Sequence, residues 1–154
     1  AVCSRWAEGW KATSEGRRRL RKVQAPDFPP DLLHTNSLDM TVVPGDDEQL
    51  VVRSDHFAHI LGRDTSITTS FELSSYFGDV VASEEFIYAS EEENKEVRCL
   101  THNGTEVAKY EEPDKNFAFP VLAPGGLLFC VLFDTDDNTL DEIVALDAQT
   151  LQPR

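Results

Sequence analysis

Residues 80–90, which read VVASEEFIYAS, decide the fold of this chain. They align without a gap with residues 121–131, VLAPGGLLFCV, at an offset of 41 positions. Both copies contain an apolar pair, a turn of four residues and a longer apolar strand. Self-similarity at a fixed period of this size is typical of architectures in which each repeat is one supersecondary unit. We therefore predict a protein built from repeated β-units.

An earlier copy extends the pattern toward the N-terminus. It begins at residues 42–47, VVPGDD, and leads into a second apolar run at residues 50–52. The second strand of each copy is predicted to end near an acidic residue: Asp55, Glu91 or Asp134. Third strands are predicted at Phe57–Leu61, Val97–Leu100 and Ile143–Leu146, with fourth strands opening at Ile67 and Val107.

Four short antiparallel strands in about 40 residues form one blade of a β-propeller. The predicted fold class is therefore mainly β: a partial propeller of about three four-stranded antiparallel blades, preceded by a short α-helical segment. The repeats are predicted over about 38–76, 77–117 and 118–154. The inner strands are apolar on both faces, as expected where blades pack face to face. An irregular β-sandwich with coincidental spacing is the alternative.

The chain before the repeats has a different character. Residues 1–23 are predicted to be helical and basic, with Val2, Cys3, Trp6 and Trp10 on one apolar stripe at helical spacing. Residues 24–37 contain Pro26, Pro29 and Pro30 and are predicted to be a proline-rich linker.

The charge distribution limits the class of partner. The net charge is −14, yet the first 23 residues carry seven basic residues against two acidic ones. The repeats are therefore strongly acidic, and a surface of that sign repels nucleic acid and anionic lipid. We expect no nucleic-acid binding by the repeats and no membrane binding, since no run of 18 apolar residues occurs.

The cysteines and the termini suggest an intracellular fragment. Three cysteines, an odd number without CxxC spacing, argue against a disulfide framework or a zinc site. Met40 is the sole methionine and the chain starts at Ala1. We expect a piece of a longer cytoplasmic or nuclear protein. We interpret Asn103-Gly104-Thr105 as a hairpin turn rather than a glycosylation site.

The second repeat resembles an NHL-type propeller repeat. The residues that carry the resemblance are GDVVAS at 78–83, FIYA at 86–89, NKEVRCL at 94–100 and NGTEV at 103–107. The resemblance implies a propeller blade. Repeats one and three lack a clear N-x-x-I/V element, so WD-type and PQQ-type blades stay open as alternatives.

The opening residues Val2-Cys3-Ser4-Arg5-Trp6 resemble the end of an F-box motif. F-box chains dock on a Skp-type adaptor within cullin ubiquitin ligases, and many carry a propeller that recruits the substrate. The resemblance therefore implies that Val2, Cys3, Trp6 and Trp10 belong to an adaptor-docking helix.

We assign no catalytic, cofactor or metal site from the sequence. Residues 134–138, DTDDN, begin like a calcium loop, but Thr139 stands where an EF-hand needs glycine and Ala145 where it needs glutamate. His56 and His59 are predicted to point to opposite faces of a strand. Cys99 and Cys130 lie in apolar strands, where thiols are usually inert.

The predicted function is a protein–protein interaction module that binds its partner through the blade loops. The F-box resemblance implies, more specifically, the substrate-recruiting part of an F-box ubiquitin ligase. We expect a binding protein rather than an enzyme, without a cofactor. One alternative is a fragment of a metal-dependent propeller hydrolase or lyase, and another is a nuclear scaffold with a basic tail. We also expect three blades alone to self-associate, because a broken ring leaves apolar faces uncovered.

Overall fold

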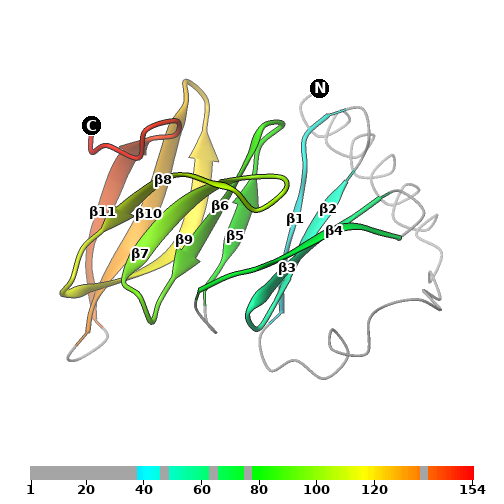
Figure 1. The fold of residues 1–154 in the computed structure, drawn as a ribbon. Helices are drawn as coiled ribbons and strands as arrows, with labels where there is room; N and C mark the ends of the chain where they lie inside the picture. The colour runs from blue at the N-terminus through cyan, green and yellow to red at the C-terminus, as the bar shows by residue number, and fades with distance from the viewer. Residues whose placement is uncertain (1–37, 46–48, 63–65, 75–77, 136–138) are drawn as a thin grey trace, which may run out of the picture.

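The computed structural model describes residues 38–45, 49–62, 66–74, 78–135 and 139–154. The predicted helix over 1–23 and the linker over 24–37 lie outside these ranges. In the described ranges eleven strands form three antiparallel sheets, each a meander of consecutive strands. Figure 1 shows the three sheets side by side, in chain order. Blade 1 contains β1 (Leu38–Val42), β2 (Leu50–Ser54), β3 (Phe57–Leu61) and β4 (Ile67–Glu72).

Blades 2 and 3 repeat this arrangement along the chain. Blade 2 contains β5 (Val80–Ala82), β6 (Phe86–Glu91), β7 (Glu96–Thr101) and β8 (Glu106–Glu111). Blade 3 contains β9 (Lys115–Ala123), β10 (Leu127–Asp134) and β11 (Leu140–Asp147). The predicted third strands of all three repeats are confirmed, and β9 begins three residues before the repeat boundary that the sequence suggested.

The structure corrects one prediction about blade 3, whose described residues form three strands instead of four. After β11 the chain turns back, and Pro153 makes a single bridge to Leu146. Proline has no amide hydrogen to donate to a neighbouring strand, which prevents a regular ladder at this point. The amide of Arg154 then donates to the carbonyl of Ala145 at 2.9 Å. This short terminal segment occupies the edge where a fourth strand was expected.

Most of the described core consists of two layers, one on each side of blade 2, and a smaller cluster around Val52 and Leu61 lies on the other face of blade 1. Alternate residues of a strand point to opposite faces of its sheet. On β6, Ile87 and Ala89 therefore pack toward blade 1, whereas Tyr88 packs toward blade 3. Full burial of one aliphatic side chain stabilises the folded state by about 1.5–3 kcal/mol relative to leaving that side chain exposed. The prediction that inner strands are apolar on both faces is confirmed for blade 2.

The outer faces of the end blades expose apolar side chains. On blade 1 these are Leu38, Met40 and Val42 of β1, and on blade 3 they include Phe119 and Ile143. Exposed apolar patches favour association between molecules. The expected self-association of the chain stays a prediction.

The meander defines two ends of the blades. The turns between first and second strands, such as 83–85 and 124–126, lie at one end, which we call the first-turn end. The turns between second and third strands, such as 92–95, and the connections between blades lie at the opposite end, which we call the connection end. The Asn103-Gly104 turn between β7 and β8 is confirmed, with the Thr101 amide donating to the Thr105 carbonyl at 2.9 Å.

Candidate functional site

Successive blades are joined by a repeated hydrogen bond. The carboxylate Oδ2 of Asp39 on β1 accepts from the backbone amide of Val80 on β5, at 2.7 Å. One blade later, Oδ2 of Asp79 accepts from the backbone amide of Phe119 on β9, at 2.8 Å. A charged acceptor makes such a bond stronger than a neutral one. The first strands of adjacent blades are therefore held in a fixed relative position.

Gly78 permits a close approach between blades 1 and 2 at the connection end. Its φ is +144°, and a Cβ at this position would lie 1.8 Å from the carbonyl oxygen of Ser90 and 2.9 Å from Nη1 of Arg53. The side chain of Arg53, from the end of β2, reaches across to donate to that same Ser90 carbonyl at 2.8 Å. Only glycine leaves room for this contact.

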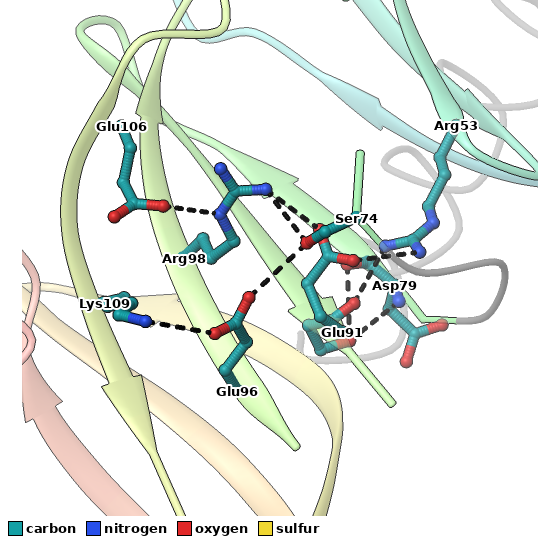
Figure 2. Close-up of polar contacts among 9 residues, drawn as sticks. Arg53, Ser74, Asp79, Glu91, Glu96, Arg98, Glu106 and Lys109 are labelled. Atoms are coloured by element: carbon teal, nitrogen blue, oxygen red, sulfur yellow. Dashed lines mark hydrogen bonds and ion pairs between the residues drawn. The ribbon is translucent and has the colours of Figure 1, made fainter. Parts of the chain in front are cut away.

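A network of charged side chains surrounds this contact (Figure 2). Nη2 of the buried Arg53 lies 3.9 Å from Oε2 of Glu91 on blade 2, and Nη1 of Arg98 lies 3.8 Å from Oε1 of the same carboxylate. Both Arg53 and Glu91 are at most 1% exposed. Burial lowers the pKa of Arg53, while Glu91 and Asp79 act in the opposite direction. The two arginines compensate the buried charge of Glu91, and a buried charge is costly unless it is paired.

The network continues onto the surface of blade 2. Arg98 donates from Nε to Oε2 of Glu106 at 2.8 Å and from Nη1 to the Ser74 hydroxyl of blade 1 at 3.1 Å. The Ser74 hydroxyl donates to Oε1 of Glu96 at 3.4 Å, and Glu96 lies 3.7 Å from Nζ of Lys109. Figure 2 shows these side chains converging from both blades. The network fixes blade 1 against blade 2 at the connection end.

A cavity of about 700 Å³ lies at the first-turn end, away from the charged network. All three blades contribute to it. The described residues that line it are Thr41, Val42, Pro44, Val81, Ala82, Ser83, Glu84, Glu85, Phe86, Tyr88, Leu122, Ala123, Gly126, Ala148 and Gln149. Its volume is in the range of about 300–1,000 Å³ that small-molecule sites occupy. Because residues of all three blades line this concave surface, we treat it as the candidate functional site.

The turns around the cavity are well braced. The Ser83 hydroxyl accepts from the amide of Phe86 at 2.9 Å, which closes the turn between β5 and β6. Nε2 of His102 lies 3.2 Å from the Ser83 carbonyl and ties this turn to the β7–β8 turn. In blade 3, Oδ1 of Asp147 accepts from the amides of Gln149 and Thr150 at 3.1 and 3.0 Å. The lining residues therefore belong to rigid turns on packed sheets.

The lining is apolar inside and acidic at one side. Phe86, Leu122 and Val81 are half-buried, and burial raises the pKa of the Tyr88 hydroxyl to about 12, so it is neutral near pH 7. Glu84 and Glu85 are exposed at the tip of the β5–β6 turn. The described lining contains no Lys, Arg or His, which disfavours an anionic ligand.

The structure describes only some of the candidate site residues named from the sequence. Val2, Cys3, Trp6 and Trp10 lie outside the described residues. His59 is buried on β3, with Nδ1 2.7 Å from the Ser70 hydroxyl, and His56 lies in the preceding turn. Among the described residues there is no group of three or more His, Cys, Asp or Glu that is arranged to hold a metal ion.

The acidic stretch at 134–138 joins β10 to β11, and part of it lies outside the described residues. Cys99 and Cys130 are free and buried, and burial raises their thiol pKa values to about 11 and about 12. Their predicted location in apolar strands is confirmed. Within the described residues no helix is long and apolar enough to cross a membrane.

Sequence reasoning did not identify the cavity or the inter-blade hydrogen bonds. A signal for the latter was present, because Asp39 and Asp79 both precede an apolar residue of a first strand, 40 positions apart. No such signal marks the cavity, since its lining comes from short, separate segments of three different blades.

Comparison with known proteins supports the fold. No protein-family model matches the chain, and no curated protein matches it. The crystal structure of BamB from Moraxella catarrhalis is similar with a TM-score of 0.58 and 20% sequence identity, covering 73% of this chain and 35% of that one. The WD40 β-propeller domain of Doa1 is similar with a TM-score of 0.50 and 16% identity, covering 73% of this chain and 42% of that one.

These similarities establish the class of fold. The described residues form propeller-type blades, and the chain spans 35% and 42% of the two solved structures. The prediction of a propeller repeat region is confirmed at this level. The narrower assignment to NHL-type repeats stays a prediction.

Proposed function

We propose that this chain is a protein-interaction module and that its partner binds in the cavity at the first-turn end. The observation that carries the proposal is a cavity of about 700 Å³ lined jointly by three consecutive blades. A site shared by three packed sheets is held rigidly, which lowers the entropic cost of binding a partner segment. The apolar lining supplies contact area, and the polar turns at its side supply orientation.

A charged side chain placed in the cavity tests this proposal. Thr41 lines the cavity, is half-buried and lies on the same face of β1 as Asp39, toward blade 2, so Thr41→Arg extends a charged side chain over the cavity. Val107 on β8 is 48% exposed and does not line the cavity, which makes Val107→Arg the matched control. Peptides selected from a random display library on the wild-type chain are then measured by fluorescence anisotropy. We expect Thr41→Arg to weaken their binding at least tenfold and Val107→Arg to leave it unchanged.

Two results would contradict the proposal. One is the failure of the library to yield any peptide that distinguishes the wild-type chain from Thr41→Arg. The other is an equal effect of Val107→Arg, which would place the binding surface elsewhere. Thermal unfolding of both variants shows whether each has kept its fold.

The finer form of this proposal is substrate recruitment within an F-box ubiquitin ligase. Its support is the resemblance of Val2, Cys3 and Trp6 to the end of an F-box, with Trp10 on the same predicted stripe. In this arrangement the N-terminal segment docks on a Skp-type adaptor and the blades bind the substrate. Co-expression of the natural chain with such an adaptor is the test. We expect co-purification that Trp6→Ala abolishes; its absence would remove the ligase proposal and leave the interaction module.

A further inference from the structure

The charges at the cavity all have one sign. Glu84 and Glu85 are the charged side chains among its described lining residues, and both are exposed. A Cβ built on Gly45, in the corresponding loop of blade 1, would lie 4.0 Å from Cγ of Glu84. Glu84 is therefore at the rim between blades 1 and 2, beside the apolar interior rather than on a remote surface.

The position of these carboxylates is set by the turn that carries them. The Ser83 hydroxyl accepts from the amides of Phe86 and Glu85, at 2.9 and 3.3 Å. The Ser83 amide also donates to the Phe86 carbonyl at 2.8 Å. These bonds close a tight turn with Glu84 and Glu85 at its tip and Phe86 at its base, on the cavity side. One turn thus presents two negative charges and an aromatic side chain to the same partner.

From this arrangement we propose that the cavity selects a basic and apolar protein segment. A Lys or Arg side chain of the partner pairs with Glu84 and Glu85 at the rim, while an adjacent apolar side chain enters the cavity against Phe86 and Leu122. The inference rests on the proposed function, because it names the class of partner for the same cavity. The net charge of −14 strengthens it, since a negative field attracts basic segments during encounter.

The experiment compares charge-neutralised variants on the full chain. Glu84→Gln/Glu85→Gln removes both rim charges at nearly constant volume. Glu72→Gln/Glu142→Gln is the matched control: both residues are exposed, lie on blades 1 and 3, and do not line the cavity. The probes are fluorescein-labelled dodecapeptides selected from a random library on the wild-type chain. Two synthetic versions of each peptide are also measured: one in which every Lys or Arg is replaced by Gln, and one in which every apolar residue is replaced by Ser.

We expect the selected peptides to contain Lys or Arg next to an apolar residue. Glu84→Gln/Glu85→Gln should raise their Kd about fivefold, as expected for the loss of two exposed ion pairs, and the control should change it less than twofold. The wild-type affinity should fall as salt is raised, and the affinity of Glu84→Gln/Glu85→Gln should fall less. Both peptide replacements should weaken binding, which excludes an interaction by charge alone.

The outcomes separate this inference from the proposed function. Peptides that lack basic residues, or a Kd that Glu84→Gln/Glu85→Gln leaves unchanged, would overturn the inference. The interaction module would stand if Thr41→Arg still blocks binding. Peptides that bind Thr41→Arg as tightly as they bind the wild-type chain would overturn both.

Discussion

The carboxylate of Asp79 in blade 2 accepts a hydrogen bond from the backbone amide of Phe119 in blade 3, at 2.8 Å. Asp39 and Val80 make the same bond one blade earlier, at 2.7 Å. The residue before Phe119 is Ala118, so the described part of blade 3 has no aspartate in the corresponding place. The series of inter-blade bonds within the described residues therefore runs from blade 1 to blade 3 in one direction.

Removing this acceptor should loosen blade 3 from blade 2. We expect Asp79→Ala to lower the free energy of unfolding by about 2 kcal/mol, the usual cost of losing a hydrogen bond to a charged group. Asp79→Asn keeps an oxygen acceptor and should lose about half as much. Urea unfolding followed by circular dichroism gives both values. An Asp79→Ala variant as stable as the wild-type chain would show that the bond contributes nothing.

Alanine substitutions at Gly78 and Gly125 separate the stability cost of steric contact from the stability cost of backbone strain. Both have positive φ, +144° and +89°, but a Cβ at Gly78 would meet the Ser90 carbonyl at 1.8 Å, whereas at Gly125 it meets nothing within 4 Å. Gly125→Ala should cost about 1 kcal/mol from strain. Gly78→Ala should cost at least about 2 kcal/mol more, because the backbone must move. Equal losses in denaturant titrations would mean that the close approach at Gly78 is unimportant.

Replacing the buried Glu91 is expected to destabilise the chain far more than replacing Glu106. Glu91→Gln removes a buried carboxylate that lies 3.9 Å from Arg53 and 3.8 Å from Arg98, and should cost about 3–5 kcal/mol. Glu106→Gln removes a partner of Arg98 that is 40% exposed and should cost about 1 kcal/mol or less. Chemical denaturation measures both. Similar losses in the two variants would indicate that water screens the Arg53–Glu91 pair.

Acid should release the turn that Asp147 organises. Hydrogen bonds from Arg154, Thr150 and Gln149 hold the pKa of this carboxylate below its usual range. The pKa of Asp147 in the folded chain is therefore below the value of about 3.9 that it has in the unfolded chain. The carboxylate stabilises the fold fully above the unfolded pKa, and this stabilisation is lost as the pH falls toward the folded pKa. We expect the stability difference between the wild-type chain and Asp147→Asn to be constant from pH 7 to about 5 and to shrink below about pH 4. A difference that does not change with pH would contradict this assignment.

The two described thiols should be unreactive until the chain unfolds. Burial raises the pKa of Cys99 to about 11 and that of Cys130 to about 12, so at pH 8 both are protonated and inaccessible. In a Cys3→Ser background, we expect reaction with a thiol reagent such as DTNB to be slow in buffer and to accelerate with urea in parallel with unfolding. Rapid labelling of the folded chain would show that the core between blades 2 and 3 opens readily.

Much of the local structure was predictable because it depends on neighbours in the chain. The run 86–89 is apolar on both faces, which predicts a strand packed between two layers, and β6 has that environment. Asn103-Gly104 predicts a tight turn because Gly104 can adopt a positive φ, here +83°. Fourth strands were predicted to open at Ile67 and Val107, and β4 and β8 lie there, whereas the described part of blade 3 has three strands and a single bridge at Pro153.

The second inter-blade hydrogen bond does not follow the sequence repeat. The separation between Asp39 and Val80 is 41 positions, and the same separation from Asp79 reaches Pro120, which has no amide hydrogen. A register shift between β9 and β10, near Phe129 and Val131, accompanies the use of the Phe119 amide instead. A bulge of this kind adds one residue to a strand and changes which groups face a neighbour.

The sequence by itself determined the strands, their turns and the stacking of repeated sheets, because strand periodicity and turn chemistry act over a few residues. The tertiary structure alone decided which groups from different blades meet. Arg53 and Glu91 are 38 positions apart and pair because their sheets face each other across a narrow gap beside Gly78. The cavity likewise forms where turns of three blades converge. Its shape depends on the relative position of packed sheets, which is set by long-range side-chain contacts rather than by local sequence.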